Sequence, residues 1–262
     1  NAKYLYSEDL LNESSTLPPR YSEGLRLIKV FENCTVCYEN PSQDRGVDGP
    51  YLYENLENIP RAVVVPHGIF LLGNDNTGGS GQQLMYGILL EDSFSPKNAV
   101  IMMQRGGGPF ARGTLRAFQG IVLQEEIDPS LARDETIQGA IISSTEELGT
   151  LIESFNGSFI EQEVTEYTPN RIEIALTGEE GFLVVAEKYF LFPGWEATVN
   201  GKSKQLFRAN GIQTGILLDG EVGTLVFEYK PSSFTKGLWI STITLLIVLG
   251  YYSYIIIRRR KR

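Results

Sequence analysis

The sequence is poor in the residues that build metal and redox centres. It contains two cysteines, Cys34 and Cys37, and one histidine, His67. A structural zinc site needs four ligands, and these three residues do not supply them. A thioredoxin-type Cys-x-x-C pair opens a helix, whereas FENCTVCYEN is rich in β-branched, aromatic and turn residues. We expect no metal and no cofactor, and the cysteines form either a local disulfide or two free thiols.

Signatures of hydrolytic catalysis are also missing. The chain has no nucleophile elbow, no H-E-x-x-H and no triad pattern. Adjacent acids in a strand point to opposite faces, so Glu125, Glu126 and Asp128 are expected to be solvated rather than paired as acid and base. No catalytic residue is therefore predicted in this chain.

One long stretch has no charge at all. Residues 238–257 contain no charged side chain, and residues 258–262 are all basic. A helix rises about 1.5 Å per residue, so this run spans about 30 Å, the thickness of a bilayer's hydrocarbon core. Five cations in a row are costly to translocate, which predicts a cytoplasmic C-terminus. We expect a membrane helix at 236–257 and a basic cytoplasmic tail at 258–262.

Acidic residues dominate the remainder. Residues 236–262 hold six of the 23 basic residues and no acid, which leaves 17 bases against 32 acids before them. Such an acidic domain is unsuited to nucleic acid, which is a polyanion. We expect residues 1–235 to lie outside the cytoplasm of a membrane-bound protein. The chain opens at Asn1 without an apolar leader, so we expect the protein to continue upstream.

The composition predicts an α+β fold with two outer domains. Residues 1–156 are interpreted as a small α/β domain and residues 157–235 as an antiparallel β-sandwich. Val63–Val65 predicts a strand buried on both faces, and Asn200-Gly201 predicts a tight hairpin. In the first domain we expect strands at 3–7, 25–31, 51–54, 62–66, 99–103 and 118–124, and helices at 82–91 and 145–155. In the second we expect strands at 161–166, 171–176, 182–189, 196–199, 205–209, 214–218 and 223–229.

Two segments resemble a known family. Residues 53–65 (YENLENIPRAVVV) and 183–202 (LVVAEKYFLFPGWEATVNGK) are similar to stretches of the YfhO-type membrane proteins, and FEYKP at 227–231 before a terminal membrane helix extends the match. The chain departs from the family pattern at Leu56, where Pro is usual, and at Leu191-Phe192, which adds length.

This resemblance implies a polytopic, GT-C-like parent enzyme that moves a sugar from a lipid-linked donor. This chain would be its non-catalytic outer C-terminal portion, which caps the upstream membrane domain and helps to position donor or acceptor. The implied partners are the bilayer, that membrane domain, and a lipid-linked sugar or surface glycan. The alternative is a cell-surface binding or structural protein, including a carbohydrate-binding module, that is anchored by a single C-terminal helix.

Three groups of residues are candidate sites. Arg105, Arg112 and Arg116 flank a glycine-rich run and can clamp a phosphate, although a plain connecting loop is the simpler interpretation. Trp195, with Tyr189 and Phe192, can form a sugar-stacking platform, although a largely buried tryptophan is the more usual case. The sequons at Asn12, Asn33 and Asn156 are candidate N-glycosylation sites.

Overall fold

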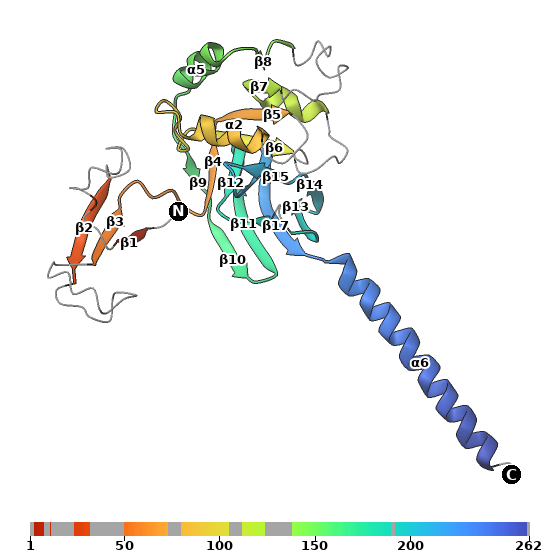
Figure 1. Ribbon diagram of the computed structural model, residues 1–262. Helices are drawn as coiled ribbons and strands as arrows, with labels where there is room; N and C mark the ends of the chain where they lie inside the picture. Colours follow the sequence, from red (N-terminus) through yellow and green to blue (C-terminus); the bar gives the residue numbers. More distant parts are fainter. Residues whose placement is uncertain are drawn as a thin grey trace. The chain divides into compact units, whose positions relative to one another are not determined.

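The computed structural model describes residues 3–7, 11, 24–31, 50–72, 80–104, 112–123, 138–189 and 192–260 (Figure 1). The chain divides into two compact units, Asn1–Arg61 and Ala62–Arg262. The fold is mixed α+β, as the sequence predicts, with most of the described structure in β-sheets and one long apolar helix at the C-terminus.

The first unit is a three-stranded antiparallel sheet. Its strands are β1 (Tyr4–Ser7), β2 (Leu25–Val30) and β3 (Tyr51–Asn55), in the order β1-β3-β2. All three coincide with predicted strands. Tyr53 in the central strand is fully buried, and its hydroxyl accepts a hydrogen bond from the Leu11 N–H at 3.0 Å.

The second unit contains a mixed sheet of nine strands in the order β8-β7-β5-β6-β15-β16-β12-β4-β9. The contacts β5–β6, β5–β7 and β7–β8 are parallel, and the others are antiparallel. The strands are β4 (Ala62–Val65), β5 (His67–Leu72), β6 (Ala99–Gln104), β7 (Gly120–Leu123), β8 (Ile141–Ile142), β9 (Ile160–Glu161), β12 (Glu180–Val185), β15 (Phe207–Ala209) and β16 (Gln213–Asp219).

Helices cover one face of the parallel half. Helix α2 (Ser80–Leu89) and helix α5 (Thr145–Ser154) pack their apolar side chains against β5 and β6. Ser144 caps the N-terminus of α5, because its hydroxyl accepts the Glu147 N–H at 3.1 Å. On the other face of the sheet, four rings pack one against the next in the order Phe207, Phe70, Phe118 and Phe182. The third ring, Phe118, directly follows the 3-10 helix η2 (Arg112–Ala117).

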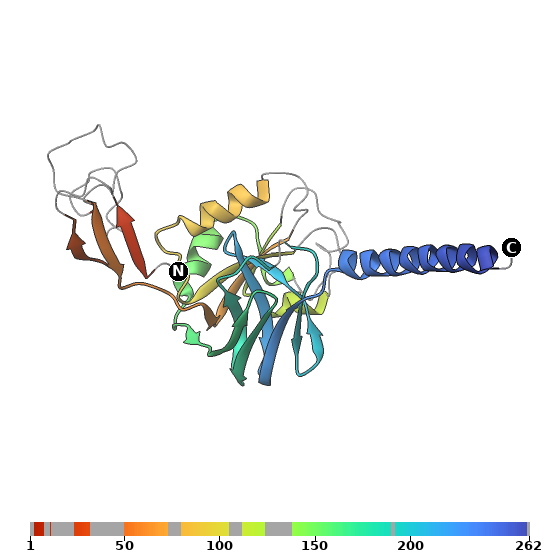
Figure 2. The ribbon, with the colours of Figure 1, turned by 90° about the horizontal axis from the view of Figure 1, so that it is seen from below.

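The antiparallel half packs against a second sheet to form the predicted β-sandwich (Figure 2). This five-stranded sheet has the order β10-β11-β17-β13-β14 and is antiparallel throughout. Its strands are β10 (Val164–Thr168), β11 (Arg171–Thr177), β13 (Trp195–Val199), β14 (Lys202–Lys204) and β17 (Val222–Tyr229). The buried side chains between the sheets come from six strands and one connection: β4, β11, β12, β13, β16, β17 and Tyr189.

Two local predictions are met in this sandwich. Strand β4 is buried along its whole length, as the run of valines indicates. Asn200 and Gly201 both have positive φ, at 49° and 79°, in the turn between β13 and β14.

The observed division of the chain differs from the expected one. The expected boundary between the two outer domains lies at residue 156. Strand β4 comes before this residue, yet it pairs with β12 on one side and with β9 on the other, and both of these strands come after it. Strands from both sides of residue 156 therefore belong to one continuous sheet. The compact units separate instead at Arg61, just before β4.

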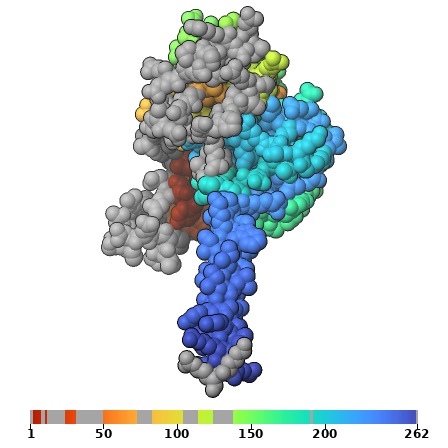
Figure 3. All heavy atoms as spheres, turned by 90° about the vertical axis from the view of Figure 1, so that its right-hand side faces the viewer, coloured from red at the N-terminus to blue at the C-terminus, as the bar shows by residue number. Residues whose placement is uncertain are grey.

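The C-terminal helix α6 (Ser232–Arg260) is continuous for 29 residues and has no buried residue (Figure 3). It is the one helix among the described residues that is long and apolar enough to cross a membrane. The helix is longer than the expected span of 236–257. It begins four residues earlier and includes Arg258, Arg259 and Arg260 in its last turn, where cations interact favourably with the helix dipole.

Candidate functional site

Three aromatic rings gather where β17 ends, close to the start of α6. Trp195 begins β13 and pairs in register with Tyr229, which ends β17. The Trp195 ring stacks on Tyr189 with centroids 4.1 Å apart and lies 5.5 Å from the ring of Tyr229. Tyr189 also contacts the buried ring of Phe227 at 5.3 Å. These contacts continue the sandwich core to the end of the sheet that is nearest in sequence to α6.

A short turn holds this cluster against the beginning of the helix. We call residues 192–194 the Phe192–Gly194 turn. The Gly194 carbonyl accepts the Lys230 N–H at 2.6 Å. Gly194 has φ +106°, and a Cβ atom there would lie 2.8 Å from the Cα of Pro231. Both the conformation and the close approach require glycine, so the turn is fixed to the residues that enter α6.

The exposure of these rings bears on the predicted sugar platform. Trp195 is partly buried and packs against the sandwich core. Its indole is contacted by Tyr189 and Tyr229, which fits the packing interpretation of this residue. The more exposed members of the group are Phe192, at 54%, and Tyr229, at 37%. An incoming ligand would meet these two rings more readily than the indole.

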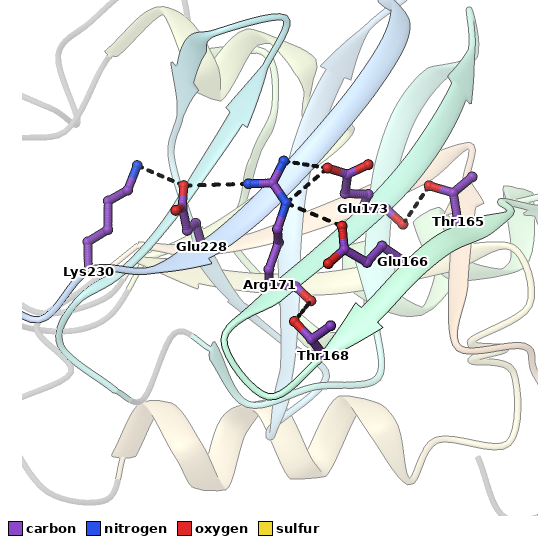
Figure 4. A network of polar contacts seen from close by, with 7 residues as sticks. All are labelled: Thr165, Glu166, Thr168, Arg171, Glu173, Glu228 and Lys230. Atoms are coloured by element: carbon purple, nitrogen blue, oxygen red, sulfur yellow. Dashed lines mark hydrogen bonds and ion pairs between the residues drawn. The ribbon is translucent and has the colours of Figure 1, made fainter.

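A network of ionic contacts lies on the outer face of the five-stranded sheet, near the same end (Figure 4). Arg171 is at its centre and contacts Glu166, Glu173 and Glu228, with Nε of Arg171 3.0 Å from Glu173 Oε1. Glu228 also forms an ion pair with Lys230, whose Nζ lies 2.8 Å from Glu228 Oε2. Three carboxylates and two cations leave this network with one net negative charge.

The pKa values of the network follow from these contacts. The hydrogen bond to Glu173 raises the pKa of Arg171, and the hydrogen bond from Lys230 lowers the pKa of Glu228. All of these side chains are accessible to solvent, so each pair contributes little to the free energy of unfolding. The network can orient the strands and present charge on this face of the sheet.

The predicted arginine cluster is described only in part. Arg105 lies outside the described residues. Arg112 begins η2, with a side chain that is not described, and Arg116 lies exposed in the last turn of η2. Arg116 and Trp195 thus belong to separate elements, one beside the parallel strands and the other in the five-stranded sheet. The predicted phosphate clamp stays a prediction.

The other predicted residues fall into two groups. The candidates outside the described residues are Cys34, Cys37, Asn12, Asn33, Glu125, Glu126 and Asp128. Asn156 is described and lies exposed between α5 and β9.

The role of His67 became clear only from the structure. Its ring stacks on Phe155 with centroids 4.6 Å apart and planes 5° apart, and its Nε2 lies 2.9 Å from the Asn156 carbonyl oxygen. Asn98 adds a second contact, because its side-chain amide donates to the Phe155 carbonyl at 3.3 Å. His67 therefore joins the start of β5 to the end of α5, and no sequence spacing could indicate a partner 89 residues away.

The contacts of Tyr229 and Lys230 could not be predicted from the sequence. Tyr229 was expected to end a strand, and both residues belong to the family-like segment FEYKP, but their pairing with Trp195 and Gly194 depends on long-range strand order. Within the described ranges, no group of three or more His, Cys, Asp or Glu side chains is placed to hold a metal ion.

Comparison of the chain with protein-family models, curated proteins and solved structures gives no match.

Proposed function

We propose that this chain is the outward-facing, non-catalytic C-terminal portion of a membrane protein, and that α6 anchors it in the bilayer. One observation carries the proposal. Strand β17 ends at Tyr229 and α6 begins at Ser232, so only two residues separate the folded β-sandwich from a helix of membrane-spanning length. In this arrangement residues 1–235 are extracytoplasmic, and the basic end of α6 lies in the cytoplasm.

We further propose that the parent is a polytopic glycosyltransferase that uses a lipid-linked sugar. The support is the resemblance to YfhO-type proteins, which covers two segments that matter in the structure. Residues 53–65 include the junction between the two compact units, and residues 183–202 contain Tyr189, the Phe192–Gly194 turn and Trp195. In this proposal the chain caps the upstream membrane domain and positions the donor or the acceptor.

A second candidate function is surface binding without transferase chemistry. The exposed rings of Phe192 and Tyr229 favour it, because apolar ring faces are suited to stacking on sugars. In that case the chain would be a cell-surface binding or structural protein held by a single helix.

Sugar transfer in isolated membranes distinguishes the two. Membranes from cells that express the complete gene product receive a radiolabelled lipid-linked sugar, and transfer to endogenous acceptor is measured. The transferase proposal predicts transfer, and a large loss when residues 62–230 are deleted while the protein stays in the membrane fraction. The binding alternative predicts no transfer from the complete protein, together with glycan binding that Phe192→Ala weakens.

A further inference from the structure

We infer that the Phe192–Gly194 turn and the first two turns of α6 form a surface that contacts the lipid headgroup layer. This inference rests on the proposed membrane anchoring and goes beyond it, because a tethered domain need not touch the lipid. In this inference, the lipid headgroup layer is the partner that covers the exposed aromatic residues at this end of the β-sandwich.

The first step is that the turn cannot move independently of the helix start. The backbone hydrogen bond from Lys230 to Gly194 and the packing of Gly194 on Pro231 fix the turn to the residue just before α6. The Phe234 N–H then bonds to the Pro231 carbonyl at 3.1 Å and closes the first turn of the helix. No free linker separates the two.

The second step is the height of the turn above the hydrocarbon core. The uncharged run starts at Leu238, six residues after Ser232. Six helical residues rise about 9 Å, and the headgroup regions add about 5–7 Å on each side of the core. The turn therefore lies near the outer edge of the headgroup layer, within reach of a phenylalanine side chain. Helix tilt would bring one side of the sandwich end still closer.

The third step is the chemistry of the side chains in this region. Phe192 is 54% exposed, Phe234 70% and Trp239 65%. Aromatic rings of this kind are favourable at the membrane interface, where one part meets apolar chains and another meets water. Lys236 lies in the first two turns of α6, and the first turn has no acidic residue, whereas Lys230 is already paired with Glu228. Lys236 is therefore the cation that we expect to face lipid phosphates there.

The packing of Trp195 favours lipid over a sugar as the occupant. A sugar-binding platform needs a free ring face, whereas the indole already contacts Tyr189 and Tyr229. Phe192 and Tyr229 are the exposed rings at this end of the β-sandwich. The Phe192–Gly194 turn is held through Gly194 against Pro231, directly before the apolar helix α6. This link to a helix of membrane-spanning length favours the lipid headgroup layer as the surface that covers the exposed rings.

Depth-dependent fluorescence quenching tests the inference on the full chain in phosphatidylcholine vesicles. Cys34 and Cys37 are first replaced by serine, and single cysteines at Phe192, Phe234, Val222 or Leu246 carry an environment-sensitive dye. Val222 is the matched control, because it is 67% exposed and lies at the opposite end of β17. That end is about 24 Å from Tyr229 along the strand. Leu246 reports insertion of α6, and unchanged thermal unfolding of each variant shows that the fold is retained.

The expected result is a blue shift and strong quenching by headgroup nitroxides at Phe192 and Phe234, quenching by deep acyl nitroxides at Leu246, and no quenching at Val222. If Leu246 is deep but Phe192 behaves like Val222, the lipid contact is wrong while the anchoring stands. If Leu246 is not quenched, the anchoring itself fails. If a soluble oligosaccharide relieves the quenching at Phe192, the surface binds glycan and the inference is also overturned.

Discussion

Gly194 and Pro231 are packed so closely that a Cβ atom on Gly194 would lie 2.8 Å from the Pro231 Cα. This contact joins the aromatic end of β13 to the residue that precedes α6. Through it, the fold of the β-sandwich fixes where α6 begins.

Gly194→Ala should destabilise the β-sandwich by about 2–4 kcal/mol, because it adds strain at positive φ to a clash with backbone atoms. Gly201→Ala is the matched control, since Gly201 has φ +79° but nothing within 4 Å of its added Cβ. It should cost only about 1–2 kcal/mol. Urea unfolding of both variants in the same detergent measures the difference, and equal losses would show that the contact with Pro231 is unimportant.

Phe227→Ala should be among the most destabilising changes in the β-sandwich. Phe227 is fully buried and contacts the ring of Tyr189, so truncation leaves a cavity that costs about 3–5 kcal/mol. Val222→Ala on the same strand removes an exposed side chain and should change the free energy of unfolding by less than about 0.5 kcal/mol. Similar losses for the two variants would contradict the packing of β17 into the core.

His67→Ala should cost about 1–3 kcal/mol, from the lost stacking on Phe155 and the lost hydrogen bond to Asn156. His67→Phe keeps an aromatic ring but cannot make the hydrogen bond, so it separates the two contributions. It should recover part of the loss in thermal unfolding. A fully stable alanine variant would mean that the junction between β5 and α5 does not depend on this side chain.

Glu221 should make stability depend on pH in the acidic range. Burial opposes its charge, but the hydrogen bond from Lys204, the backbone N–H groups of Asp219 and Glu221 and the positive charge of Lys204 together outweigh burial and lower the pKa of Glu221. A carboxylate with a lowered pKa stabilises the fold above its unfolded pKa, and this contribution is lost as pH falls through the folded value. Glu221→Gln should therefore flatten the loss of stability below about pH 4.5. A pH profile of Glu221→Gln identical to that of the unsubstituted protein would refute the ion pair with Lys204.

Local signals in the sequence predicted much of the fold. The valines of β4, the serine cap of α5, the Asn200-Gly201 turn and the apolar length of α6 each act within a few residues. Strand β5 was missed, because Pro66 separates it from β4 and its apolar run was not recognised as a second strand. The strand order was also unpredictable, since pairings such as β6 with β15 join segments about a hundred residues apart.

The candidate site was predicted less completely for the same reason. The sequence singled out Trp195 and Phe192, but their setting depends on the pairing of β13 with the end of β17. Nothing near Trp195 in the chain indicates that Tyr229 contacts it, or that Lys230 and Pro231 contact the neighbouring Gly194. The ionic network at Arg171 likewise combines residues of β10, β11 and β17 that only the sheet brings together.

Membrane sidedness is the central claim, and protease protection tests it most directly. The full chain carries one epitope tag in the β13–β14 turn after Gly201 and another after Arg262, and intact cells are treated with protease. We predict that the first tag is lost and that the tail tag survives on a short fragment until the membrane is permeabilised. Survival of the first tag with loss of the tail tag in intact cells would contradict the account.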